Sequence, residues 1–201
     1  MLSINNATSL TTTDLRPVRI LSKRDNSNLY LAFDVEDTTV PSSIRPVGDK
    51  VVVQINPNNS RDSALIGDER RLVVTTMRGS PGSNSIAWQA RSTTGGWGVA
   101  PGVTVPGPTG NTWTLTNNVQ VGIQDRPSGT PGYVVEIKIP FAAIGYTLGS
   151  TPATIRDIGV AIAVINDRGF EAELVVGEGN TTVLSAASFP ETTVLHVSDS
   201  N

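Results

Sequence analysis

Few residues in this chain of 201 residues could carry acid–base or nucleophilic chemistry. His196 is the single histidine and there is no cysteine, so a Cys/His pair is excluded and a Ser/His/Asp triad would depend wholly on His196. This histidine alternates with apolar neighbours, which predicts an outward-facing strand residue. Glu171 and Glu173 have the spacing of a glycosidase pair, but the apolar residues between and beside them predict the solvent side of an amphipathic strand. We therefore expect no enzymatic activity.

Acidic residues cluster at Asp34, Glu36 and Asp37, where a β-rich run ends. Calcium takes about six to eight oxygen ligands from carboxylates, amides and backbone carbonyls, so this cluster is a candidate site for a structural calcium ion. No contiguous Asp/Asn loop with ligand spacing strengthens that interpretation. The alternative is a solvated strand end, and no other cofactor is expected.

Trp97 is the side chain best suited to stack against a ligand. It lies in the loop-rich segment 78–110, and the three glycines around it leave the indole uncovered by local side chains. Long irregular segments of compact domains often carry binding sites. A flat aromatic face can stack on a sugar ring, and Arg91 and Gln89 on an adjacent strand could donate hydrogen bonds to its hydroxyls. The alternative is that the indole pins the long loop to the domain.

Composition narrows the class of protein. Hydrophobic residues make up 38% and charged residues 16%, while 19 glycines and 13 prolines occur among many Ser, Thr and Asn, a usage typical of strands and turns. The net charge of −3 offers no basic field, which argues against nucleic acid and against insertion into an anionic membrane. No apolar run approaches the ~20 residues of a membrane span. The length suits a single all-β domain.

Alternating and apolar runs separated by turns predict the elements. In the segment Leu29 to Val35 every second residue is apolar, which places one face against the core and points Asp34 the other way. Trp88 and Trp113 are expected to be buried in strands. The other strands are expected at 18–22, 50–55, 70–77, 86–91, 113–115, 119–124, 133–139, 158–165, 169–176 and 193–197, with a helical turn at 141–144. About ten strands at this spacing predict a single antiparallel β-sandwich of jelly-roll or immunoglobulin-like type.

Three segments carry a family resemblance: Asn28 to Thr39, Gly132 to Gly145 and Asp157 to Gly169. Their order resembles family 9 carbohydrate-binding modules and related DOMON-like sandwiches, over residues 14–198. The resemblance implies a glycan-binding module, often with structural calcium. It also implies that Glu136, between two apolar residues of its strand, has a hydrogen-bonded structural role.

The sequence departs from that family at the sugar site. Typical members clamp a terminal sugar between two tryptophans, where this chain has Pro46 and Ala186 or Ala187, and Val52 and Leu72 replace polar contacts. No binding residue is therefore carried over. Glycan binding, if retained, is expected at Trp97.

Two further interpretations stay open. A structural or assembly protein, such as a decoration unit of a virion or surface array, would use residues 1–13 as an ordered arm that contacts a protein partner, whereas in a lone sugar module this tail would fray. Haem held by Met77 and His196, as in some DOMON-like sandwiches, is disfavoured because Met77 ends a strand beside a turn. Glycan binding and assembly both predict a location outside the cell or on a cell or virion surface. No signal peptide is visible after Met1.

Overall fold

The computed structural model describes residues 2–4, 18–37, 49–57, 69–76, 84–91, 97–99, 112–115, 117–127, 129–145, 156–166, 172–176 and 193–197. The elements that these residues form are thirteen strands and a short 3₁₀ helix, namely β1 (Leu2–Ile4), β2 (Val18–Arg24), β3 (Asn28–Glu36), β4 (Asp49–Asn56), β5 (Arg70–Thr76), β6 (Ser85–Arg91), β7 (Trp97–Val99), β8 (Thr112–Thr114), β9 (Gln120–Asp125), β10 (Gly132–Pro140), η2 (Phe141–Ile144), β11 (Arg156–Asn166), β12 (Ala172–Val176) and β13 (Thr193–Val197).

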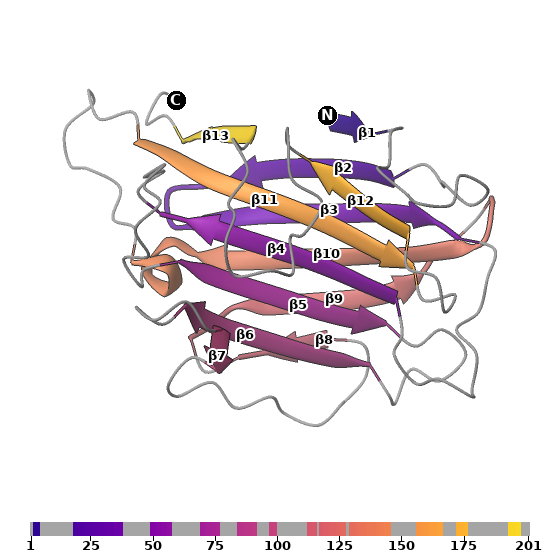
Figure 1. The fold of residues 1–201 in the computed structure, drawn as a ribbon, viewed down its shortest axis with the longest axis horizontal. Coiled ribbons are helices and arrows are strands. Elements are labelled where there is room, and N and C mark those ends of the chain that lie inside the picture. The colour runs from indigo at the N-terminus through magenta and orange to yellow at the C-terminus, as the bar shows by residue number, and fades with distance from the viewer. Residues whose placement is uncertain are drawn as a thin grey trace.

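The strands form two antiparallel sheets that pack face to face (Figure 1). The six-stranded sheet has the order β1-β2-β3-β10-β9-β8, and the seven-stranded sheet has the order β12-β11-β4-β5-β6-β7, with β13 also paired to β11. In each sheet an early strand pairs with a late one, β3 with β10 and β4 with β11. Both sheets therefore need both halves of the chain, and the predicted single all-β sandwich is confirmed.

The core lies between the two sheets. In β3 every second residue from Leu29 to Val35 is buried, as the alternation predicted. Trp88 of β6 and Trp113 of β8 are only 1% and 2% exposed, which confirms them as core residues. Burial of a large apolar side chain stabilises a fold by roughly 2–3 kcal/mol. Leu72, at a position where the resembling family has a polar sugar contact, is fully buried in the same core.

Two strands were missed by the sequence analysis. β1 lies inside the segment 1–13 that was expected to be a tail or arm, and it pairs with β2 at the edge of the six-stranded sheet. β7 lies inside the loop-rich segment 78–110 and pairs with β6. Each has only three residues, too few for alternation to identify a strand among polar or glycine-rich neighbours.

The outer faces of the two sheets differ in exposure. In β4, Val52 and Gln54 point away from the core, yet they are 0% and 2% exposed. On the six-stranded sheet, the outward side chain of Glu136 in the central strand β10 is exposed. At their centres, the outer face of the six-stranded sheet is thus more exposed than that of the seven-stranded sheet.

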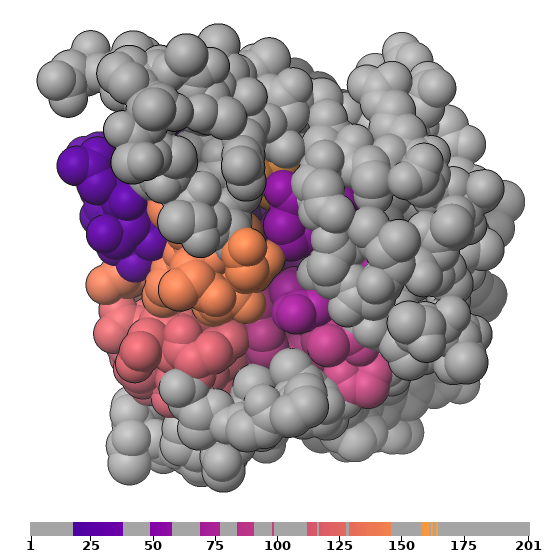
Figure 2. Space-filling view, turned by 90° about the vertical axis from the view of Figure 1, so that its left-hand side faces the viewer, coloured from indigo at the N-terminus to yellow at the C-terminus, as the bar shows by residue number. Residues whose placement is uncertain are grey.

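The short helix η2 closes one end of the sandwich. Phe141 and Ile144 are buried, and the Phe141 N–H donates to the Ser27 carbonyl oxygen at 2.8 Å. Figure 2 looks onto this end, where the orange residues at the end of β10 and in η2 lie between the indigo residues of β2 and β3 and the purple and magenta strands of the other sheet. The turn between β2 and β3 is thereby tied to β10.

Candidate functional site

An open groove of about 610 Å³ crosses the outer face of the six-stranded sheet. It is lined by residues of five neighbouring strands: Leu21, Ser22 and Lys23 of β2, Tyr30, Leu31 and Ala32 of β3, Glu136, Ile137 and Lys138 of β10, Gln120, Val121 and Gly122 of β9, and Thr112 of β8. These residues come from neighbouring strands of one sheet. The pairing register between the strands therefore decides which side chains lie next to one another in the groove.

Small residues form the floor of the groove. Ala32 pairs with Glu136, which in turn pairs with Gly122 on the next strand. A Cβ atom added at Gly122 would meet nothing within 4 Å. Since outward side chains of neighbouring strands stand beside one another, the small residues Ala32 and Gly122 leave a hollow on either side of Glu136.

Tyr30 stands at one end of this floor, and its hydroxyl group is fixed. The hydroxyl donates to Asp25 Oδ2 at 2.7 Å. The other oxygen, Asp25 Oδ1, accepts from the backbone N–H groups of Ser27 and Asn28, both at 2.7 Å, which is the local geometry that makes Asp a good turn residue. The Asn28 side-chain amide adds bonds of 3.1 Å to both carboxylate oxygens. The β2–β3 turn therefore holds the tyrosine ring in place.

This network changes the acidity of both partners. The hydrogen bond from Tyr30, followed by those from Ser27 and Asn28, lowers the pKa of the Asp25 carboxyl well below its ordinary value. The same hydrogen bond to Asp25 raises the pKa of the Tyr30 hydroxyl. Tyr30 therefore keeps its proton, and its bond to Asp25, across the physiological range.

We expect Tyr30 to titrate above the ordinary tyrosine pKa of about 10. Because its folded-state pKa is raised, the contribution to stability is fully present below about pH 10 and is lost as the pH rises through the folded-state value. An NMR titration of the tyrosine ring carbons measures this. Asp25→Asn should bring the Tyr30 pKa back toward its ordinary value, and an unchanged pKa in that variant would contradict the network.

The remaining groups around the floor are suited to hydrogen bonding. Gln120, Thr112 and Glu136 are exposed on the groove side of β9, β8 and β10. The hydrogen-bonded structural role expected for Glu136 is not found, because none of the described residues bonds to its carboxylate and the strand alternation points it outward. Leu21, 40% exposed, adds an apolar side chain to the wall.

The predicted residues Arg91, Gln89 and Trp97 lie on the other sheet. The register of β6 and β7 pairs Arg91 with Trp97 and Gln89 with Val99, so the three positions are neighbours. Gln89 is half-buried, and its Oε1 accepts from Arg71 Nε at 2.6 Å. Burial lowers the pKa of Arg71. The side chains of Arg91 and Trp97 lie outside the described part of the structure, so their role as ligand contacts stays a prediction.

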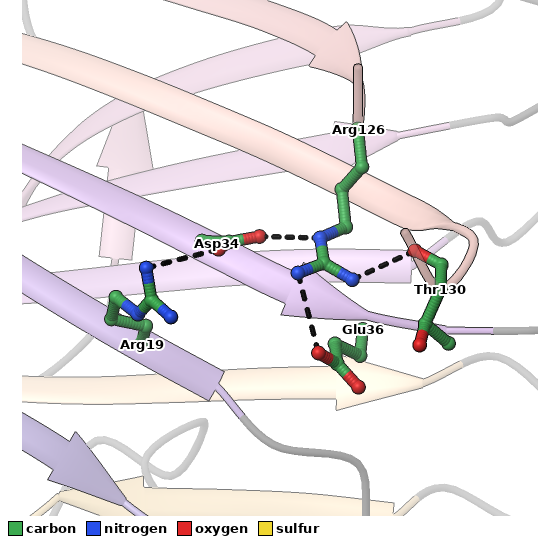
Figure 3. A network of polar contacts seen from close by, with 5 residues as sticks. All are labelled: Arg19, Asp34, Glu36, Arg126 and Thr130. Atoms are coloured by element: carbon green, nitrogen blue, oxygen red, sulfur yellow. Dashed lines mark hydrogen bonds and ion pairs between the residues drawn. The ribbon is translucent and has the colours of Figure 1, made fainter. Parts of the chain in front are cut away.

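Two of the three acidic residues considered for calcium, Asp34 and Glu36, are arranged around Arg126 (Figure 3). Arg126 Nε donates to Asp34 Oδ1 at 2.6 Å, and its terminal nitrogens reach Glu36 Oε1 at 3.2 Å and the Thr130 carbonyl oxygen at 2.7 Å. Asp37 is 2% exposed, and its backbone N–H donates to Pro131. The described residues contain no group of three His, Cys, Asp or Glu side chains able to hold a metal ion.

We expect the melting temperature to be the same in excess calcium and in excess chelator. Arg126 already neutralises Asp34 and Glu36, and a calcium ion would have to displace its guanidinium. Differential scanning fluorimetry in both conditions measures this. An increase of several degrees with calcium that Asp34→Asn abolishes would instead assign a calcium site to this cluster.

Several other positions singled out by the sequence are not among the described residues. Met77, Glu171, Pro46 and the alanines 186 and 187 lie outside the described residues. His196 lies in β13, which was predicted as a strand, and it pairs with Asp157 of β11. The side chain of His196 is outside the described part. No helix in the described residues is long and apolar enough to cross a membrane.

The groove itself was missed by the sequence analysis. Tyr30 and Ala32 were interpreted only as the side of β3 opposite the core, and Gly122 and Lys138 belong to strands about ninety residues or more further along. The sequence did contain one indication of a groove: the small residues Ala32 and Gly122 on the outward sides of β3 and β9. It becomes interpretable only when β3 is known to pair with β10 and β10 with β9.

Comparison with known proteins identifies a similar fold. No protein-family model matches this chain, and no curated protein matches its sequence. Among solved structures, the chain is similar to a crystal structure named as that of a "putative carbohydrate-binding protein" from Bacteroides uniformis, with a TM-score of 0.57 and 11% sequence identity. The match covers 96% of this chain and 84% of the other. The likeness supports the β-rich fold over nearly the whole chain, and the more specific resemblance to family 9 modules stays a prediction.

Proposed function

We propose that this protein is a non-catalytic carbohydrate-binding β-sandwich that holds an oligosaccharide in the groove on its six-stranded sheet. The observation that carries the proposal is the fixed ring of Tyr30 beside a floor of small residues, with polar side chains around it. Sugars present C–H faces that stack on aromatic rings and hydroxyl groups that need oriented donors and acceptors. A tyrosine held in place before binding loses little conformational entropy when the ligand arrives.

The dimensions of the groove suit an extended ligand. One line of paired residues runs from Leu21 through Ala32, Glu136 and Gly122 to Thr112, across five strands. With neighbouring strands about 4.8 Å apart, this line is roughly 19 Å long. It can accommodate several sugar units lying across the strands, rather than one terminal sugar clamped between two rings.

The similar solved structure supports this function through its name. If the two sandwiches share a role as well as a fold, this protein binds carbohydrate and works outside the cell or on a cell or virion surface, where polysaccharides and glycans are found. Binding to a single site would be weak, and several copies would raise the effective concentration.

The β6–β7 hairpin is the second candidate for the sugar-binding site. Its register brings the backbone positions of Arg91 and Trp97 opposite each other, with Gln89 two residues away on β6. This pairing supports a compact site if the indole of Trp97 is accessible. The groove is the preferred place because it combines the fixed ring of Tyr30 with an open floor of small residues.

A glycan array tests the function with four proteins: the unaltered chain, Gly122→Ile, Trp97→Ala and Gln124→Ala. A β-branched residue fits the extended, unobstructed position of Gly122 and fills the floor of the groove. Gln124 is exposed on the same strand but outside the groove, so Gln124→Ala is a matched control. We expect selective glycan binding that Gly122→Ile abolishes and the other two variants retain.

Two other results would redirect the assignment. Binding lost only in Trp97→Ala would move the site to the β6–β7 hairpin. No glycan binding by a well-folded protein would contradict the function, and the predicted role as a structural or assembly protein would then be tested by a search for a protein partner.

A further inference from the structure

Two lysines flank Tyr30 in the groove. In the sheet register, Lys23 of β2 pairs with Tyr30 on one side, and Lys138 of β10 pairs with it on the other. Paired residues of adjacent antiparallel strands have Cα atoms about 4.5–5.5 Å apart, and their outward side chains share one face. Both ammonium groups can therefore reach a ligand that stacks on the tyrosine ring.

The described residues leave both lysine charges available. Asp25, the acid nearest to Lys23 in sequence, is engaged by Tyr30 and by the β2–β3 turn. Asp34, further along the same face, is engaged by Arg126, with Arg19 at 3.9 Å. No ion pair joins either lysine to a carboxylate within the described part of the chain. The two charges are thus free to meet a ligand.

Protection of a sheet edge does not account for Lys138. Lysines on edge strands prevent unwanted pairing with other chains. β10, however, lies between β3 and β9 in the middle of the six-stranded sheet. Lys138 thus places a cation on the open face of a central strand, beside the fixed ring of Tyr30.

We infer that the oligosaccharide bound in this groove carries an anionic group, a carboxylate or a sulfate, which lies between Lys23 and Lys138. This inference rests on the proposed function. Ammonium groups bind such oxyanions through charge-assisted hydrogen bonds. The protein as a whole has a net charge of −3, so the attraction comes from these two side chains and not from the general field.

Glu136 sets the orientation of such a ligand. It lies two residues before Lys138 on the same face, which separates the two positions by roughly 7 Å along the strand. Its carboxylate would repel an anion and accept hydrogen bonds from hydroxyl groups. The anionic group therefore lies at the Tyr30 end of the groove, and the neutral part of the sugar extends over Glu136 toward Gly122 and Thr112.

The test measures binding to paired oligosaccharides that differ in charge: oligogalacturonides and their methyl esters, sialylated glycans and their desialylated forms, and sulfated glycans and their unsulfated forms. The variants are Lys23→Gln, Lys138→Gln and Glu136→Gln, with Lys50→Gln on the other sheet as a control that removes the same charge. We expect each groove lysine variant to weaken binding of the charged member about fivefold, and Glu136→Gln to strengthen it about threefold, as expected for exposed charges several ångströms apart. Higher salt should weaken the charged member more than its neutral partner.

The results separate this inference from the function on which it rests. Equal binding of charged and neutral members, lost in Gly122→Ile but unchanged in the lysine variants, would overturn the anionic preference and leave the groove as a neutral sugar site. Absence of binding to every glycan would overturn both. The pairs also distinguish carboxylate from sulfate as the recognised group.

Discussion

Replacing Gly132 with alanine is expected to destabilise the protein by about 3 kcal/mol, because the added methyl group has no space. A Cβ atom at this position would fall against the Val35 carbonyl oxygen, closer than van der Waals contact allows, and 2.8 Å from Arg126 Cδ. Both neighbours are fixed, since Val35 belongs to a central strand and Arg126 is bonded to Asp34. In a domain of this size the melting temperature should fall by about 6–12 °C.

Gly122→Ala is the matched control for that experiment. Gly122 lies in the neighbouring strand β9, where an added Cβ atom meets nothing within 4 Å. Its stability should change by less than about 0.5 kcal/mol. Thermal denaturation, monitored by circular dichroism, gives the melting temperature of both variants. A Gly132→Ala protein with the same melting temperature as the unaltered chain would show that β10 does not approach β3 as described.

Tyr30→Ala is expected to weaken glycan binding about thirtyfold or more, which corresponds to about 2 kcal/mol. The change removes the stacking ring from the end of the groove and leaves the floor and the polar side chains in place. Tyr30→Phe keeps the ring but removes the hydroxyl that donates to Asp25 at 2.7 Å. We expect this second variant to lose only about threefold to tenfold, the effect of a less firmly held ring.

Isothermal titration calorimetry with a glycan selected on the array measures both tyrosine variants. Circular dichroism should give the same sheet content for all proteins, since Tyr30 is half-buried and outside the core. Equal affinity in Tyr30→Ala and the unaltered chain would remove Tyr30 from the site. Complete loss in Tyr30→Phe would mean that the hydroxyl itself contacts the sugar.

Local patterns in the sequence were sufficient to predict most of the fold. The alternation in β3 identified which side of the strand faces the core, and the placement of Trp88 and Trp113 on expected strands predicted their burial, because tryptophan on a strand normally buries most of its area. The Asp, Asn and Ser residues between β2 and β3 are typical of a turn. These features depend on neighbours within a few residues, which is the range over which a single sequence is informative.

The groove could not be predicted in the same way, because it depends on register between distant strands. Ala32 and Glu136 are paired although more than a hundred residues separate them, and nothing local to either fixes that pairing. Glu136 was therefore given a structural role from the family resemblance and its place between two apolar residues. The ion pairs of Arg126 with Asp34 and Glu36 were missed for the same reason, since local sequence offered only a candidate calcium site or a solvated strand end for these acids.

The central claim is that the ligand lies on the open face of the six-stranded sheet. The most direct measurement is a two-dimensional ¹H–¹⁵N NMR titration of the full chain with a glycan selected on the array. We predict that the largest shifts occur at the amides of Ala32, Gly122 and Lys138, while the indole N–H of Trp97 does not move. Shifts centred on the Trp97 indole and the Arg91 amide, with the groove amides unchanged, would contradict the claim and place the site on the β6–β7 hairpin.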